Sequence, residues 1–128
     1  MSYYFAKILQ TDFDAAIQRT TDVLKQHGFG IITEINVTDT FKKKIGKDFR
    51  RYRILGACNP SMAYEALQLE DKVGTMLPCN VVVQEVTQGH VEVAAIDPVA
   101  SMQAIPNDRL RTTAIQVQQK LRDVVNAL

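Results

Sequence analysis

The two cysteines are the residues of this sequence whose type and surroundings are best suited to chemistry. Cys58 is followed by Asn59 and a proline, and Cys79 lies between Pro78 and Asn80. The first motif is typical of a strand that ends where a helix begins, and the second of a strand that begins directly after a proline. If these strands are neighbours, both thiols lie at the same end of a sheet. The candidate ligand-binding residues are therefore Cys58, Asn59, Cys79 and Asn80.

A thiol beside a helix N-terminus is a good ligand or nucleophile, because the helix dipole favours its thiolate form. Two thiols at one site could bind a soft metal ion, cycle between dithiol and disulfide, or hold a small molecule. Two sulfurs are fewer than the four ligands typical of zinc, and the spacing of His27 and His90 does not bring them to the same site. We predict no resident cofactor, with a soft metal at Cys58 and Cys79 left open. The alternative is that both cysteines are small, buried packing residues.

Three functions compete on these observations. The favoured one is a small binding module, with a site for a small molecule or a soft metal at Cys58 and Cys79. The alternative is a thiol-disulfide redox protein that uses the same two residues. The weaker alternative is an interaction or nucleic-acid module built on the basic run from Lys42 to Arg53, which contains seven basic residues and one acidic residue, Asp48. Because such runs are usually solvated surface, we expect no nucleic-acid partner.

Composition and motifs narrow the class of protein further. The chain has 128 residues, of which 46% are hydrophobic and 23% charged, and its net charge is +1. This length predicts one domain over residues 1–128. The apolar runs are too short to cross a bilayer, and the N-terminus has no signal-peptide pattern, so we expect a cytoplasmic protein with no membrane partner. No P-loop, dinucleotide motif or nucleophile–base pair is present, which argues against an enzyme. A homodimer is left open.

The elements that must position the cysteines follow from hydrophobic periodicity. Strands are predicted at 3–9, 30–36, 49–58, 80–86 and 90–96, with a further extended segment at 73–77 that stops at Pro78. Gln88-Gly89 would turn the last two strands into a hairpin. Helices are predicted after Thr11 as N-cap, at 39–45, and after Asn59 as N-cap.

The final segment has the most regular pattern of all. From Leu110 to Leu128 the apolar residues recur at steps of four and three, which predicts a long helix with one apolar seam. The tight turn between consecutive strands favours an antiparallel sheet. Together these features predict an α+β fold, with helices packed on one face of the sheet and a long C-terminal helix.

Several motifs also carry a resemblance to a known family. These are Lys-Ile-Gly at 44–46, the stretch 52–60 that ends in Cys58-Asn59-Pro60, the stretch 77–83 that contains Pro78-Cys79-Asn80, and Asp97-Pro98. In these motifs, and over essentially its whole length, the chain resembles the bacterial and archaeal family catalogued as domain of unknown function 302. The resemblance implies a curved antiparallel sheet of the broad βαββββα type, with the helix after Cys58 inside a long connection. It implies no activity, but it gives added weight to Cys58 and Cys79, which occupy motif positions.

Overall fold

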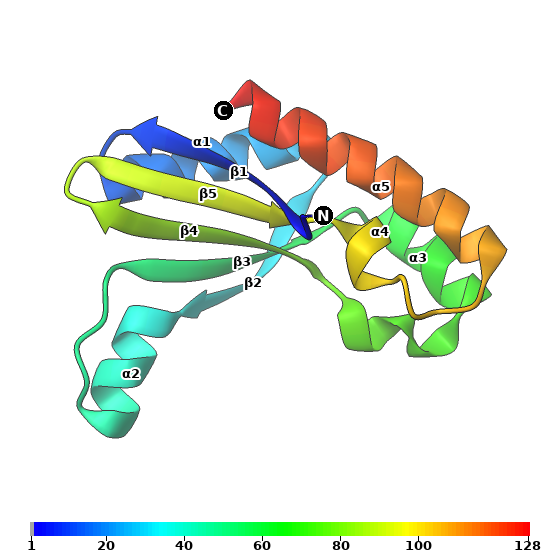
Figure 1. Cartoon of the computed structure of the whole chain (residues 1–128), viewed down its shortest axis with the longest axis horizontal. Coiled ribbons are helices and arrows are strands. Elements are labelled where there is room, and N and C mark those ends of the chain that lie inside the picture. Colours follow the sequence, from blue (N-terminus) through cyan, green and yellow to red (C-terminus); the bar gives the residue numbers. More distant parts are fainter. Residues whose placement is uncertain (1) are drawn as a thin grey trace.

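Five antiparallel strands form the sheet of the computed structural model, which describes residues 2–128. The strand order across the sheet is β1-β5-β4-β3-β2, so the first strand pairs with the last one (Figure 1). β4 and β5 form the predicted hairpin, and β3 joins β4 to β2. The strands are β1 (Tyr4–Gln10), β2 (Gly30–Asn36), β3 (Tyr52–Cys58), β4 (Cys79–Thr87) and β5 (His90–Ile96).

The helices complete the predicted βαββββα order. α1 follows β1 and the long α5 follows β5, while the shorter helices lie within the connections between strands. The α+β fold with a long C-terminal helix is therefore confirmed. The helical elements are α1 (Phe13–Gln26), α2 (Val37–Ile45), α3 (Pro60–Leu69), the 3-10 helix η1 (Asp71–Met76), α4 (Pro98–Ser101) and α5 (Asp108–Ala127). None of the helices described for residues 2–128 is long and apolar enough to cross a membrane.

The main core lies between one face of the sheet and the helices α1 and α5. Buried residues alternate with more exposed ones along β4 and β5, as expected for strands with a single covered face. In Figure 1, α1 and α5 run along the same side of the sheet, whereas α2 lies apart from them. The sheet contributes Leu9, Leu55, Val81, Val83, Val91 and Val93 to this core. The two helices contribute Phe13, Ala16, Leu24, Leu121, Val124 and Val125.

The seam predicted for the C-terminal helix is buried, and it serves two clusters. Leu121, Val124 and Leu128 join the main core. Leu110, at the start of α5, instead packs with Ala66 of α3 and Val73 of η1 in a second, smaller cluster. α5 therefore connects the sheet to the α3–η1 region, at the end of the sheet where the cysteines lie.

Two of the predicted helix starts can be compared directly with the structure. Asn59 caps α3 as predicted, since its side-chain oxygen accepts a hydrogen bond of 3.2 Å from the Met62 N–H. The prediction of Thr11 as the cap of α1 is wrong, because Asp12 accepts a 2.8 Å hydrogen bond from the Ala15 N–H. Threonine and aspartate are both good N-cap residues. The cap lies one position later than predicted because the helix begins at the buried Phe13.

The prediction of an extended segment at 73–77 is also wrong. Residues Asp71–Met76 form the 3-10 helix η1, which follows α3 almost without a break. Val73 is fully buried in the small cluster with Ala66 and Leu110. A short apolar run is compatible with a strand or with a helical turn, and here burial against α3 and α5 decides between them.

Candidate functional site

Cys58 and Cys79 lie where β3 ends and β4 begins. In the register of the sheet, Cys79 is opposite Ala57 and Cys58 is opposite Gly30. Both thiols are free, Cys79 being buried and Cys58 half-buried. The two residues therefore stand at the ends of adjacent strands, beside the N-terminus of α3.

The structure does not support the predicted cysteine pair. Successive residues of a strand point to opposite faces, and cross-strand partners share a face. Cys79 and its partner Ala57 are both buried on the helix-covered face. Cys58 is one residue further along β3 and is paired with Gly30 of β2, so it is not the cross-strand partner of Cys79. The sequence motifs located both strand ends, but they did not show this register.

A cavity of about 280 Å³ opens at this end of the sheet, among β2, β3, the start of β4, α3, α4 and α5. Cys58, Asn59 and Cys79 all contribute to its wall. Most of the remaining wall is apolar and includes Phe29, Met62, Leu67, Leu77, Met102 and Val117. Three of the four predicted site residues thus line one cavity: Cys58 from the end of β3, Asn59 from the cap of α3 and Cys79 from the start of β4.

The fourth predicted residue lies elsewhere. Asn80 is exposed, and its register partner is Gly56, on the face of the sheet opposite the helices. It does not contribute to the cavity wall. Asn80 as a ligand-binding residue therefore stays a prediction.

Few polar side chains face the cavity, and the side-chain oxygens of Asn59 and Thr113 already have hydrogen-bond partners. The side-chain oxygen of Asn59 caps α3 through the Met62 N–H. The hydroxyl of Thr113, a buried residue of α5, donates a 3.1 Å hydrogen bond to Glu65. The cavity therefore offers little unused hydrogen-bonding capacity to a bound molecule.

The environment of Cys79 favours the neutral thiol. Burial raises the pKa of Cys79 to about 11 from an ordinary value of 9.0, with a smaller contribution from the charge of Cys58. At neutral pH, Cys79 is therefore protonated and a poor nucleophile. This suits a residue that packs against a bound molecule better than one that attacks it.

Gly56 allows the strands beside the cavity to approach closely. A Cβ atom at this position would lie 1.9 Å from Thr33 Oγ1 and 2.7 Å from Pro78 Cγ. Pro78 itself lines the cavity and immediately precedes Cys79. The absence of a side chain at Gly56 thus determines where β4 enters the sheet and where Cys79 is held.

The arrangement does not provide a metal centre. Within residues 2–128, no group of three or more His, Cys, Asp or Glu side chains could hold a metal ion. The ring of His27 contacts the Val23 carbonyl at the end of α1, and that of His90 contacts the Gln88 carbonyl in the hairpin turn. A soft metal would have at most the two cysteine sulfurs as ligands.

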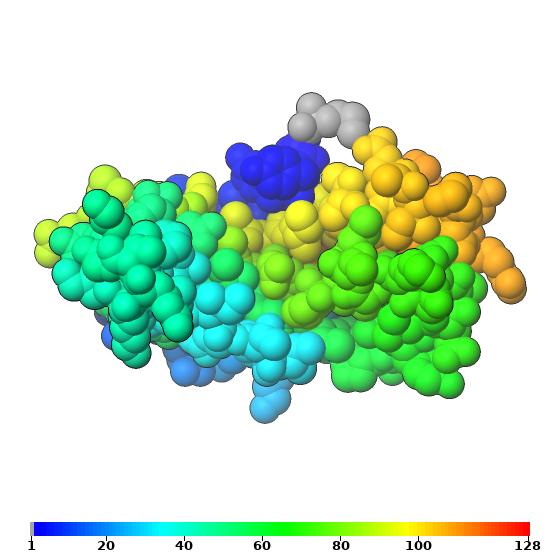
Figure 2. All heavy atoms as spheres, turned by 90° about the horizontal axis from the view of Figure 1, so that it is seen from below, coloured from blue at the N-terminus to red at the C-terminus, as the bar shows by residue number. Residues whose placement is uncertain are grey.

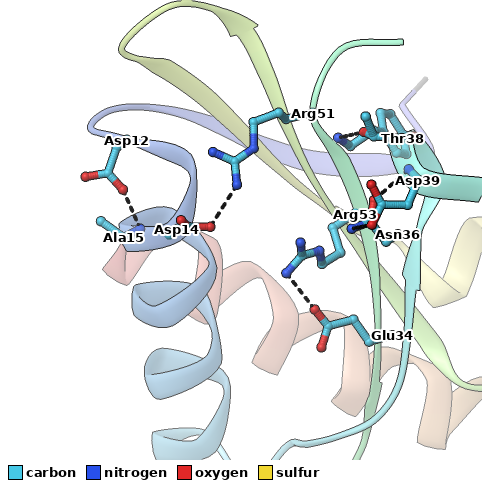
Figure 3. A network of polar contacts seen from close by, with 10 residues as sticks. Asp12, Asp14, Ala15, Glu34, Asn36, Thr38, Asp39, Arg51 and Arg53 are labelled. Atoms are coloured by element: carbon cyan, nitrogen blue, oxygen red, sulfur yellow. Dashed lines mark hydrogen bonds and ion pairs between the residues drawn. The ribbon is translucent and has the colours of Figure 1, made fainter. Parts of the chain in front are cut away.

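The basic run from Lys42 to Arg53 lies away from the cavity. α2 (teal) and α3 (green) occupy opposite ends of the molecule in Figure 2. Three cations of the basic run are paired with acids, each at 2.9 Å. Lys42 pairs with Asp48. Figure 3 shows the other two pairs, Arg51 with Asp14 on α1 and Arg53 with Glu34 on β2. The pairing reduces the positive charge that this surface presents to a polyanion.

Sequence reasoning missed most of the cavity wall. The sequence predicts a helix after Asn59 and an apolar seam from Leu110 to Leu128, but it does not predict that Met62, Ala63, Leu67 and Val117 line a cavity. The available signal was the small size of the side chains where the helices face one another, Ala63 and Ala66 on α3 and Ala114 on α5, all of which line the cavity. Small residues at facing positions leave space between helices, but the sequence alone does not show which helices face one another.

The comparisons with known proteins agree on one family. A family model described as "Domain of unknown function DUF302" matches residues 5–128, a range that includes both cysteines and the cavity. None of the curated proteins matches the chain. A crystal structure of an uncharacterized conserved DUF302 protein from Bacillus stearothermophilus is 27% identical, with a TM-score of 0.90 over 98% of each chain. The predicted resemblance is therefore confirmed, and this chain belongs to the DUF302 family.

Proposed function

We propose that this protein binds a small, predominantly apolar molecule in the cavity beside Cys58 and Cys79. The observation that carries the proposal is an apolar cavity of about 280 Å³ at the junction of the sheet with α3 and α5. This volume is just below the ~300–1,000 Å³ of typical ligand pockets, so the ligand is smaller than a drug-sized molecule.

The chemistry of the wall supports an apolar ligand. A polar molecule entering the cavity would exchange its hydrogen bonds with water for contacts with side chains such as Phe29, Leu77 and Met102. Each unpaired polar group would cost roughly 1–3 kcal/mol. An aliphatic or aromatic molecule loses no hydrogen bonds on entry and gains about 25 cal/mol for each Å² of apolar surface buried.

The two thiols have different roles in this proposal. Cys79 is buried and stays protonated at neutral pH, and so provides a soft, polarisable part of the wall. Cys58 is more exposed and lies at the start of the loop to α3. This difference favours ligand binding over a redox couple, since the pKa of about 11 makes Cys79 a poor attacking group.

A titration followed by NMR tests the proposal. Benzene and toluene, as small apolar probes, should shift the ¹H–¹⁵N signals of residues around the cavity, while glycerol at the same concentration should not. The variant Ala63→Leu places a larger side chain in the cavity wall, and we expect it to weaken probe binding by tenfold or more, about 1.4 kcal/mol.

The matched control is Ala15→Leu, the same change on the exposed side of α1, and it should leave the affinity unchanged. Signal shifts that Ala63→Leu does not reduce, or an absence of shifts with both probes, would contradict the proposal. Native mass spectrometry of the purified wild-type protein would also report any co-purified molecule and the oxidation state of the thiols.

A further inference from the structure

A second cavity, of about 380 Å³, lies where the end of β5 meets α4 and the first half of α5. Figure 1 shows α4 beside α5, directly after the end of β5. We call this space the Asp97 cavity, because the carboxylate-bearing Asp97 belongs to its wall together with Gln118 and Arg111. Its volume lies within the ~300–1,000 Å³ of typical ligand pockets. Unlike the apolar cavity beside the cysteines, the Asp97 cavity presents charged groups to a bound molecule.

The carboxylate of Asp97 is buried and receives hydrogen bonds from neutral groups. Asp97 is 9% exposed. The Val99 N–H donates a 2.9 Å hydrogen bond to Oδ1, and Nε2 of Gln118 lies 3.0 Å from each of the two carboxylate oxygens. None of the ion pairs formed within residues 2–128 involves Asp97. A buried charge costs free energy unless it is paired, so a cation that reached this carboxylate would be stabilised by it.

Capping of α4 accounts for only part of this arrangement. The cap uses Oδ1 of Asp97, which accepts the hydrogen bond from Val99. A carboxylate has about four acceptor sites, and Oδ2 receives a hydrogen bond only from the Gln118 nitrogen that it shares with Oδ1. Oδ2 can therefore accept a further donor without the loss of the cap.

Asp97 is also held in place by three other elements. Its backbone N–H donates a 2.8 Å hydrogen bond to the Tyr3 carbonyl, next to the pairing of β1 with β5. Its side chain is held by Val99 of α4 and Gln118 of α5. A group fixed before binding loses little conformational entropy when a ligand arrives.

The charges of the wall indicate the kind of ligand. Its other charged side chains, Asp108 and Arg111, are exposed and opposite in sign, so the net negative charge is that of Asp97. Within residues 2–128, no cluster of three or more His, Cys, Asp or Glu side chains could hold a metal ion. An alkylammonium group needs fewer ligands, because its N–H donors can be satisfied by one carboxylate and neutral oxygens.

We propose that the Asp97 cavity binds a small organic ammonium compound, whose charged group pairs with the Asp97 carboxylate. The carbon part of such a ligand would contact Met102 and Leu110, the apolar residues of the same wall. The proposal does not depend on ligand binding beside the cysteines, because it rests on a different cavity and on a charged group.

The test compares three probes of nearly equal size by NMR, at equal concentrations and constant ionic strength. Ethanolamine, which is an ammonium ion at neutral pH, should shift the Val99 N–H signal and the side-chain amide signals of Gln118. Ethylene glycol, which has a hydroxyl in place of the ammonium group, and the anion glycolate should leave these signals nearly unchanged.

Two variants and a matched control locate the binding. Asp97→Asn removes the charge but keeps an oxygen that can cap α4, and it should weaken ethanolamine binding by about tenfold or more. Ala100→Leu keeps the carboxylate but places a larger side chain in the wall, and it should also weaken binding. The control is Asp123→Asn, because Asp123 is exposed and likewise accepts a hydrogen bond from a glutamine, Gln119, at 3.0 Å. It should leave the affinity unchanged.

Circular dichroism checks that each variant is folded, and Ala100→Leu with the three wild-type titrations decides the matter if Asp97→Asn unfolds. An absence of shifts with ethanolamine would overturn the proposal and leave Asp97 as the cap of α4. Equal shifts with ethylene glycol would also overturn it, because the cavity would then not select a cation. A loss of affinity in Asp123→Asn as large as in Asp97→Asn would mean that ethanolamine binds through the general charge of the surface.

Discussion

Placing a methyl group at Gly56 should destabilise the protein, although alanine is normally the better residue in regular structure. The new Cβ would lie 1.9 Å from Thr33 Oγ1 and 2.7 Å from Pro78 Cγ. The Thr33 hydroxyl can rotate away, but its Cβ would still be 3.3 Å distant, and the proline ring is rigid. Overpacking of this kind costs about 1–3 kcal/mol. With an unfolding entropy of roughly 0.27 kcal/mol per kelvin for a chain of this size, Tm should fall by about 4–11 °C.

Gly30→Ala is the matched control, since Gly30 lies in the neighbouring strand, pairs with Cys58, and has no atom within 4 Å of the position that a methyl group would take there. That change should be neutral or stabilise by up to about 1 kcal/mol, because alanine reduces the entropy of the unfolded chain. Urea unfolding monitored by circular dichroism measures both variants. If Gly56→Ala and Gly30→Ala shift the midpoint equally, the close approach at Gly56 does not determine how β4 enters the sheet.

Three further outcomes follow from buried groups. Leu121→Ala should lower the free energy of unfolding by about 2–5 kcal/mol, because Leu121 is fully buried in the core. Ile115→Ala, on the exposed side of α5, should lower it by less than about 1 kcal/mol in the same urea unfolding experiment. Equal losses would mean that the seam does not face the core. Because the pKa of Cys79 is raised in the folded protein, its contribution to stability is complete below pH 9.0 and is lost as the pH rises through about 11. Over this range the free energy of unfolding of wild type should therefore fall more steeply than that of Cys79→Ala. In pulsed alkylation at neutral pH, Cys58 should react before Cys79, because Cys79 is buried and protonated; comparable rates, followed by mass spectrometry, would contradict this order.

The order of the elements could be predicted because each signal was local. Asn59-Pro60 specifies a helix start through the cap and the missing N–H, and the regular steps from Leu110 to Leu128 specify one helical seam. Val73 shows the limit of such signals, because a single buried side chain satisfies the pattern of a strand or of a 3-10 turn. The 3-10 turn forms because Val73 packs against Ala66 and Leu110, which come from other parts of the chain.

The candidate site could be predicted only in part for the same reason. The motifs located the ends of β3 and β4, and therefore Cys58, Asn59 and Cys79. Whether a side chain lines the cavity depends on strand alternation and on the register between strands, which leave Asn80 outside the cavity wall. The cavity itself exists because small residues of α3 and α5 meet, and that meeting is a property of the tertiary structure.

The pairing of β1 with β5 has a consequence for synthesis on the ribosome. The partners Gln10 and His90, and likewise Tyr4 and Ile96, are separated by most of the chain. β1 must therefore wait, unpaired, until the hairpin of β4 and β5 has emerged, and loop closure over such distances is slow. Until β5 emerges, β4 is an edge strand, because Val81 and Val83 lack their partners Ala95 and Val93. Nascent chains stalled before residue 96 should accordingly be sensitive to proteolysis and dependent on chaperones, and longer ones should become protected as α5 emerges and closes the core.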